Sequence, residues 1–274
     1  MTVQKHELIR AIESAFPLCI QEAWDNSGWQ IDLMRPDESV GRVLVTLDTT
    51  RETVREAEEA GVDLIVEHHP LFFVHPTRID ASGAAPDPAG EYAAALIKAG
   101  VSVYAAHTTF DTAEGGMNDA LAQALGLTDV EGFPIPCAGS DGKWSHAMGR
   151  KGTAPEEFRT FSGFCSKAEE LFDMKGRLKT VGAPDAAVRT VALCGGAGGD
   201  FVIDAIREGV DLYITADVKH HEARWANERG LLLIDGGHHG TEKIFVRVMA
   251  GFLRDTFAGR LEVIGSQTSR DPWA

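Results

Sequence analysis

The sequence has few cysteines, few positive charges and no long apolar run. Its four cysteines (Cys19, Cys137, Cys165 and Cys194) lie far apart without a Cys-x-x-Cys pair, so neither a disulfide framework nor a thiolate zinc site is predicted. The 26 Lys and Arg residues are outnumbered by 41 Asp and Glu residues. The resulting net charge of -15 disfavours sequence-independent binding to nucleic acid or to an anionic membrane. No stretch approaches the apolar length of a membrane span.

The remaining composition is that of an ordinary globular protein. With 274 residues, of which 44% are hydrophobic, the chain can bury a substantial core and suits one large or two small domains. Residues 1–18 place charged side chains between apolar ones at helical spacing, which predicts an amphipathic first helix rather than a targeting segment. We therefore expect a cytoplasmic protein that does not insert into membranes.

Short apolar runs alternate with helical patterns along most of the chain, which predicts an α/β fold. Residues 43–47 and 62–66 are strand-like and flank a helical pattern at 50–60, giving a β-α-β unit. Proline and glycine make residues 75–90 a loop and begin a less regular region near Leu127. The other predicted elements are helices at 91–99, 117–125 and 241–256, strands at 101–106, 188–194 and 231–234, and a helix within 159–179.

One segment of the sequence is echoed later in the chain. Residues 59–66 resemble residues 207–214, and both contain Gly-Val-Asp-Leu at a helix-to-strand joint. Each copy is followed shortly by a pair of histidines. The echo suggests two related α/β halves. The alternative is chance similarity between two ordinary joints.

The histidines are clustered with acids at the ends of predicted strands. Glu67-His68-His69-Pro70 follows the strand at 62–66, and adjacent histidines on an extended backbone point to opposite faces. Such a pair suits two neighbouring metal ions better than one, although a His-His pair is also common as a packed, hydrogen-bonded feature. Two further clusters have ligand-like spacing: His107 with Asp111, and His238 and His239 with Glu242. Together the clusters predict a dinuclear metal site.

Two other motifs have competing interpretations. The glycine run at 195–199 could hold a phosphate at a helix N-terminus, but it lacks Gly-x-Gly-x-x-Gly spacing, so a tight turn is an equal alternative. Asp-Asn-Ser-Gly at 25–28 is strong turn chemistry between Trp24 and Trp29. Spacing alone favours a turn held by buried tryptophans there.

Taken together, these motifs resemble the dinuclear-metal-centre hexameric protein family, often named GTP cyclohydrolase 1 type 2 homologues or NGG-interacting-factor-like proteins. The resemblance spans nearly the whole chain in family order, including the histidine clusters, 24–28, Leu47-Asp48, 194–196 and 215–219. It implies two related α/β domains with mixed sheets flanked by helices. Residues 1–126 plus 230–274 would form the metal-binding domain and residues 127–229 the second domain. It also implies a toroidal homohexamer, a trimer of dimers.

The resemblance also implies a set of site residues. It assigns two divalent ions to each subunit, and imidazoles with carboxylates suit Zn, Fe, Mn or Ni. His107 would lie close to the metals as a catalytic proton relay, and Asp217, Lys219 and His221 would face the same cavity, although Asp217 also suits a helix N-cap. The implied metal ligands are His68 and Asp111 on one ion, His69 and His238 on the other, and Glu242 bridging both.

Three residues beside these ligands depart from the family pattern. Thr109 and Phe110 stand where Asn and Leu are usual, and His239 stands where Tyr is common. These changes are expected to alter substrate fit or the hydrogen bonds behind the ligands, and His239 could compete as a ligand.

The implied activity is hydrolytic. The family name points to opening of the guanine imidazole ring of GTP with release of formate, with Lys219 and the glycine run meeting the triphosphate. Two alternatives stay open: a metal-dependent phosphoesterase acting on nucleotides, and a non-catalytic hexameric metal-binding or scaffold protein with a regulatory partner. Formate as product would indicate ring opening, and inorganic phosphate would indicate phosphoester cleavage.

Overall fold

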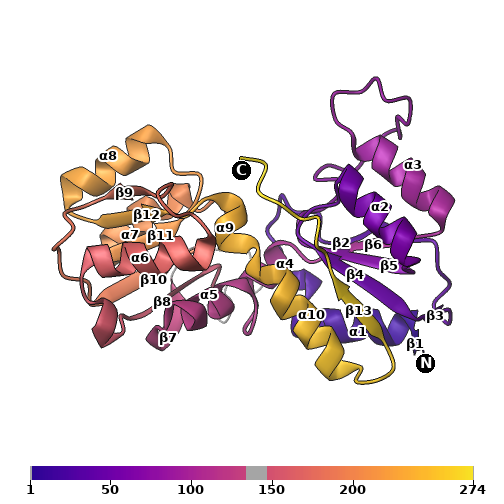
Figure 1. Cartoon of the computed structure of the whole chain (residues 1–274), viewed down its shortest axis with the longest axis horizontal. Helices are drawn as coiled ribbons and strands as arrows, with labels where there is room; N and C mark the ends of the chain where they lie inside the picture. Colours follow the sequence, from indigo (N-terminus) through magenta and orange to yellow (C-terminus); the bar gives the residue numbers. More distant parts are fainter. Residues whose placement is uncertain (1, 134–146, 274) are drawn as a thin grey trace. The chain divides into compact units, whose positions relative to one another are not determined.

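The computed structural model describes residues 2–133 and 147–273, and internal contacts divide the chain into two compact units (Figure 1). The first unit is Met1–Phe110 with Phe245–Ala274, and the second is Asp111–Ile244. These breaks differ from the expected domain boundaries at 126/127 and 229/230, because helix α5 (Met117–Leu125) and strand β12 (Leu232–Asp235) belong to the second unit. Cys137 and the prolines and glycines of 134–146 lie outside the described residues.

The first unit contains a five-stranded mixed sheet with the strand order β13-β4-β5-β6-β2. Its four parallel strands place their carboxyl ends at one edge, where ligands of α/β sheets usually gather. The edge strand β2 runs antiparallel to β6. The strands are β4 (Arg42–Thr46), β5 (Leu64–Glu67), β6 (Ser102–Ala105), β13 (Glu262–Gly265) and β2 (Gly28–Ile31).

Helices cover both faces of this sheet, with α2 and α3 on one face and α1 and α10 on the other (Figure 1). On the α2–α3 face, Leu44 of β4, Ile65 of β5 and Val103 of β6 belong to one hydrophobic cluster. Val54 of α2 and Leu96 of α3 complete this cluster. Burial of each such side chain stabilises the fold by about 1.5–3 kcal/mol. The helices are α1 (Lys5–Ala15), α2 (Arg51–Ala60), α3 (Ala89–Ala99) and α10 (Ile244–Thr256).

The second unit has a six-stranded mixed sheet with the order β7-β8-β10-β11-β12-β9. Its central strands β10, β11 and β12 are parallel. The strands are β7 (Thr128–Phe133), β8 (Gly149–Thr153), β9 (Lys179–Val181), β10 (Thr190–Leu193), β11 (Leu212–Thr215) and β12 (Leu232–Asp235).

Helices α7 and α8 pack apolar residues against Tyr213 of β11 and Leu233 of β12, on one face of this sheet. The helices are α5 (Met117–Leu125), α6 (Phe161–Phe172), α7 (Val202–Glu208) and α8 (His220–Arg229). The expected mixed sheets flanked by helices are confirmed in both units.

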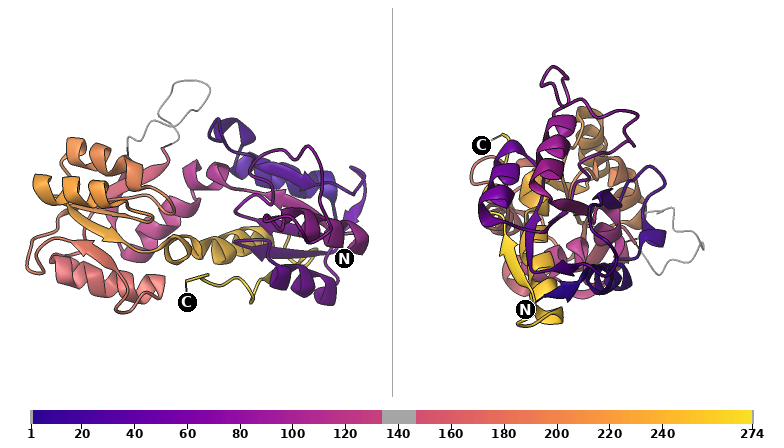
Figure 2. Two further views of the ribbon diagram at one scale, coloured as in Figure 1. Left: turned by 90° about the horizontal axis from the view of Figure 1, so that it is seen from above. Right: turned by 90° about the vertical axis from the view of Figure 1, so that its right-hand side faces the viewer.

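The last segment of the chain, from residue 245 onward, returns to the first unit (Figure 2). The predicted helix at 241–256 is in fact two helices, α9 and α10, separated at Lys243. No helix of the described residues is both long enough and apolar enough to cross a membrane. The short elements are β1 (Val3–Gln4), β3 (Ser39–Val40), α4 (Thr108–Thr112), α9 (His238–Glu242) and 3-10 turns at Leu18–Ile20, Glu156–Phe158 and Gly199–Phe201.

The sequence echo corresponds to the same structural joint in both units. α2 ends at Gly61 and α7 ends at Gly209, each glycine in the left-handed conformation. The aspartate two residues later accepts hydrogen bonds from the two backbone N–H groups where the preceding strand begins. Asp63 accepts from Gly41 and Arg42, and Asp211 accepts from Arg189 and Thr190. The two joints therefore have the same local structure, with the same hydrogen bonds.

Candidate metal centre

Two of the predicted ligands lie at the carboxyl end of β5, in the first unit. His68 is fully buried, and its Nδ1 lies 2.9 Å from the carbonyl oxygen of Ala106. Because a carbonyl can only accept, Nδ1 carries the hydrogen, so this ring could bind a metal only through Nε2. The Nδ1 of His69 lies 2.7 Å from Oδ1 of Asp48, which follows the neighbouring strand β4. Adjacent strand ends therefore orient both rings.

A third imidazole comes from the end of β6. The Nδ1 of His107 lies 2.7 Å from Oδ1 of Asp25, whose side chain is completely buried. Asp25 also accepts hydrogen bonds from the hydroxyls of Ser27 and Thr108. Burial acts to raise the pKa of Asp25, but hydrogen bonds from His107, Thr108 and Ser27 hold this pKa well below its usual range. An ionised carboxylate thus fixes the ring of His107.

These three histidines form one cluster. Each offers a ligand nitrogen, and the three atoms lie within 4.8 Å of one another. Since the Nδ1 atom of each ring lies against an oxygen, Nε2 is the atom through which each ring could bind a metal. A carboxylate or carbonyl behind each imidazole is the usual support of a histidine ligand, so this end of the sheet can hold a divalent transition metal, with His68 and His69 as the ligands that the family resemblance implies and His107 beside them.

Aromatic rings surround the cluster. On one side the ring centroid of Phe245 lies 4.9 Å from His68, and Phe110 packs 4.9 Å from Phe245. The departure at Phe110 therefore fills the core behind His68. On the other side Trp24 and Phe73 lie 5.7 and 5.5 Å from His107, edge to face. The expectation of a buried Trp24 is wrong, because 62% of this side chain is exposed.

A buried carboxyl group precedes the histidine pair. Glu67 is completely buried, and this burial raises its pKa to about 8. Thr49 Oγ1 and the backbone N–H of Leu71 donate to its two oxygens, at 2.5 and 2.7 Å. These two hydrogen bonds satisfy both oxygens of the buried carboxyl group.

The second unit presents a histidine and a carboxylate from α9. His238 and Glu242 lie one helical turn apart, with His238 Nε2 3.0 Å from Glu242 Oε2. This contact requires the helix to begin at His238, earlier than the predicted start at 241. The Nδ1 of His238 lies 2.6 Å from Asp217 Oδ2. His238 is thus oriented by an oxygen in the same way as the three histidines of the first unit.

The glycine turn after β10 packs against this pair. A Cβ atom at Gly196 would overlap the carboxylate of Glu242, and the φ of +66° also favours glycine. The N–H of Gly196 donates to Thr241 Oγ1 at 3.0 Å. Burial and the charges of Asp111 and Glu242 raise the pKa of the Cys194 thiol well above its usual range, so both carboxylates lie near this turn. The glycine run makes room for a carboxylate, and the tight-turn interpretation fits.

Asn118 connects the proposed ligand Asp111 to the same turn. This fully buried side chain donates to the carbonyl oxygens of Asp111, at 3.1 Å, and Met148. Its Oδ1 accepts from the N–H of Gly195 at 2.8 Å. The side chain of Asn118 therefore links the backbone at Asp111 to the backbone at Gly195, in the turn that packs against Glu242.

Comparisons with known proteins find matches over nearly the whole chain. The family model for Duf34/NIF3 (NGG1p interacting factor 3) matches residues 3–272. The chain belongs to the Duf34/NIF3 family. A GTP cyclohydrolase 1 type 2 homolog of Streptomyces coelicolor is 37% identical over 276 residues, covering 97% of this chain and 92% of that protein. NGG1-interacting factor 3 of Saccharomyces cerevisiae is 30% identical over 290 residues, covering 98% and 96%. The solved structure of a Bacillus cereus protein related to NIF3 matches with a TM-score of 0.86 at 25% identity, covering 100% of this chain and 99% of that one.

Within this Duf34/NIF3 chain, the residues of the predicted second-domain segment divide into two groups. Asp217 contacts His238, as an orienting residue would. Lys219 instead forms ion pairs with Asp200 and Glu222. His221 packs against Trp225 at 4.9 Å.

Sequence reasoning gave no role to Asp25, Asp48 or Asn118 in the Duf34/NIF3 site. Asp25 and Asp48 lie in quoted family motifs, and Asp48 ends the strand beside that of His69. The carboxyl ends of adjacent parallel strands meet at one edge of a sheet, and this rule could have placed Asp48 beside His69. No local pattern distinguishes Asn118 from an ordinary helix residue.

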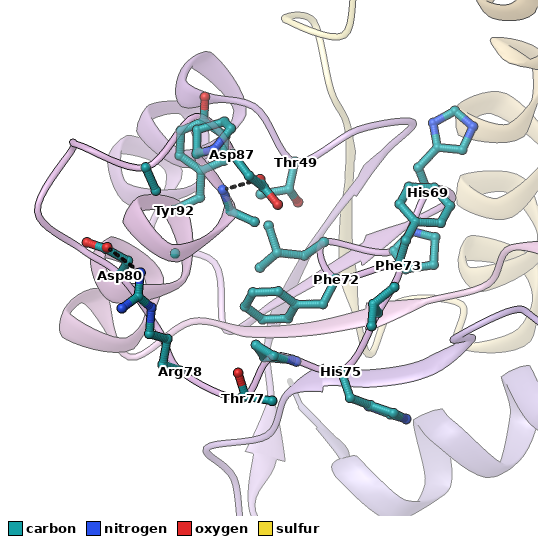
Figure 3. Close-up of a pocket in the computed structure, with 18 of the residues that line it drawn as sticks. Thr49, His69, Phe72, Phe73, His75, Thr77, Arg78, Asp80, Asp87 and Tyr92 are labelled. Atoms are coloured by element: carbon teal, nitrogen blue, oxygen red, sulfur yellow. Dashed lines mark hydrogen bonds and ion pairs between the residues drawn. The ribbon is translucent and has the colours of Figure 1, made fainter.

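A pocket of about 700 Å³ adjoins His69 in the first unit (Figure 3). It is lined by Asp48 and Thr49 before α2, by His69 and Pro70 after β5, by part of the loop at 71–88 and by the start of α3. Its volume lies within the usual range for small-molecule sites. A candidate binding cavity therefore adjoins the histidine cluster.

Proposed function

We propose that this chain is a dinuclear-metal-dependent hydrolase. The supporting observation is the orientation of the imidazole rings. In each of four histidines the Nδ1 atom lies within hydrogen-bonding distance of an oxygen: His68, His69 and His107 in the first unit, and His238 in the second. The donor types suit Zn, Fe, Mn or Ni equally. The residues that would hold the two ions are His68, His69, Asp111, His238 and Glu242.

The chain's own residues supply the proton chemistry. When bound, the two ions supply Lewis acidity and a water molecule of lowered pKa. His107 accepts and returns a proton at Nε2, because Asp25 holds the hydrogen on Nδ1. The ionised Asp25 also stabilises the positively charged form of that ring. Phe110 and Phe245 keep water from the buried side of His68.

The first reaction to test is opening of the guanine imidazole ring of GTP with release of formate. Its support is the sequence resemblance and the name carried by the Streptomyces coelicolor relative. The triphosphate contacts expected from Lys219 and the glycine run find no support, since Lys219 is paired with acids and Gly196 adjoins Glu242. Release of inorganic phosphate instead of formate would identify a phosphoesterase.

The decisive experiment is elemental analysis of the purified protein and of Glu242→Ala, combined with formate and phosphate assays on GTP. We expect about two ions per subunit in the wild type and a sharp fall in the variant, together with loss of turnover. Glu228→Ala, an exposed acid on α8, serves as the control and should keep both metal and turnover. A Glu242→Ala protein that loses its metal but keeps full activity would overturn the mechanism. Absence of metal after reloading would favour the scaffold alternative.

We further propose a homohexamer, on the basis of the family resemblance alone. Light scattering of the purified protein should give six times the chain mass of 29.5 kDa. A monomer or dimer at micromolar concentration would contradict this assembly.

A further inference from the structure

The pocket beside His69 has an aromatic side. Phe72 is partly buried against the hydrophobic core, whereas the next residue, Phe73, is 50% exposed. The ring centroid of Phe73 lies 6.4 Å from His69 and 5.5 Å from His107. Figure 3 shows Phe73 beside His69, with Tyr92 elsewhere on the pocket wall. An exposed phenyl ring in contact with two site histidines offers a stacking surface for a flat ligand.

The charged residues of the same pocket are mainly acidic. Asp48, Asp80 and Asp87 line it, and Arg78 is its single Lys or Arg. The guanidinium of Arg78 lies 3.6 Å from the carboxylate of Asp80, so an acid already balances this cation (Figure 3). With no metal bound, a triphosphate would meet the further carboxylates of Asp48, which is hydrogen-bonded to His69, and of Asp87, and like charges placed together disfavour binding. Ring N–H groups, in contrast, would find carboxylate acceptors.

We propose that this pocket binds an uncharged, N–H-bearing heteroaromatic ring of nucleobase or nucleoside size, and that it excludes a triphosphate chain. The inference rests on the proposed hydrolase, and it replaces GTP with the nucleoside as the substrate expected to be turned over. The ring stacks on Phe73, and its polar edge faces the carboxylates of the pocket. This arrangement presents the ring to His69 and His107 and makes the nucleoside a better ligand than the nucleoside triphosphate.

The test is titration calorimetry of the full chain, stripped of metal, with guanosine, GTP and inorganic tripolyphosphate as probes. We expect guanosine to bind at least about ten-fold more tightly than GTP, and tripolyphosphate not to bind. Phe73→Ala should weaken guanosine binding about ten-fold, as loss of a stacking partner does, and Phe73→Trp should retain it. Ile79→Ala is the matched control, since Ile79 lies in the same loop, is 49% exposed and does not line this pocket.

The proposal is overturned if GTP binds as tightly as guanosine, or if Phe73→Ala binds guanosine like the wild type. Repeating the titration with metal-loaded protein, alongside turnover assays on both guanosine and GTP, separates this inference from the proposed function. Guanosine binding that depends on Phe73, in a protein that holds two ions and turns over no substrate, supports the pocket and rejects the hydrolase. Turnover of GTP without guanosine binding rejects the pocket and keeps the hydrolase.

Discussion

Asp25 accepts hydrogen bonds from several buried donors and thereby stabilises the loop that carries His107. We predict that Asp25→Ala lowers the free energy of unfolding by about 1–3 kcal/mol, because it leaves buried donors without their acceptor. Urea denaturation measures this loss. Asp37→Ala, which removes an exposed carboxylate, should change the same quantity by less than about 0.5 kcal/mol. Equal effects of the two changes would contradict the assigned role of Asp25.

Gly196 is required for two separable reasons, its backbone conformation and its closeness to Glu242. Gly196→Ala and Gly209→Ala both place a side chain at a φ of +66°. The new Cβ atom would clash with the carboxylate of Glu242 at position 196, whereas at position 209 it would meet open space. We expect each change to destabilise the protein by roughly 1 kcal/mol or more, and Gly196→Ala alone to lower the metal content. Thermal denaturation with elemental analysis tests this. Full metal loading in Gly196→Ala would show that Glu242 can move without loss of the site.

Cys194 should be chemically inert in the metal-free protein, in contrast to Cys19. Cys194 is buried, and its raised pKa keeps the thiol protonated, whereas Cys19 is exposed. Treatment with iodoacetamide at pH 8, followed by mass spectrometry, should modify Cys19 within minutes and leave Cys194 unmodified until the protein is denatured. Modification of both at similar rates would mean that the turn at 194–196 opens readily.

At the scale of helices and strands, the joint shared by both units should contribute similarly to each. We predict that Asp63→Ala and Asp211→Ala each lower the free energy of unfolding by about 1–3 kcal/mol, because each removes the acceptor of two backbone N–H groups. Glu59→Ala, an exposed change on α2, is the control. A loss for only one aspartate would mean that the two joints are not equivalent.

Most strands and helices could be predicted from the sequence, because their apolar periodicity is strong. The helix 117–125 was predicted with the bounds of α5, and the strand 43–47 differs from β4 by one residue at each end. The sequence does not predict the break at Lys243, since neither proline nor glycine stands between Thr241 and Phe245 to mark it. The exposed Trp24 was also missed, because local turn chemistry does not reveal which side chain the fold leaves uncovered.

At the scale of the whole molecule, the site depends on contacts between residues far apart in sequence. The His107–Asp25 contact spans 82 positions, and the Asn118–Gly195 hydrogen bond spans 77. No local pattern contains such pairs. The ligand list came from the family resemblance, and the supporting residues emerged only once the strands were assembled into sheets.

The division of the chain into an interrupted unit and a continuous one has a consequence for synthesis. The second unit is complete once residue 244 has left the ribosome, whereas the first still awaits α10 and the strand β13 that pairs with β4. During translation, the N-terminal sheet therefore carries an open edge while a whole later unit can fold ahead of it. A nonsense mutation shortly after residue 244 would leave the second unit whole and the first, with its histidine cluster, unfinished.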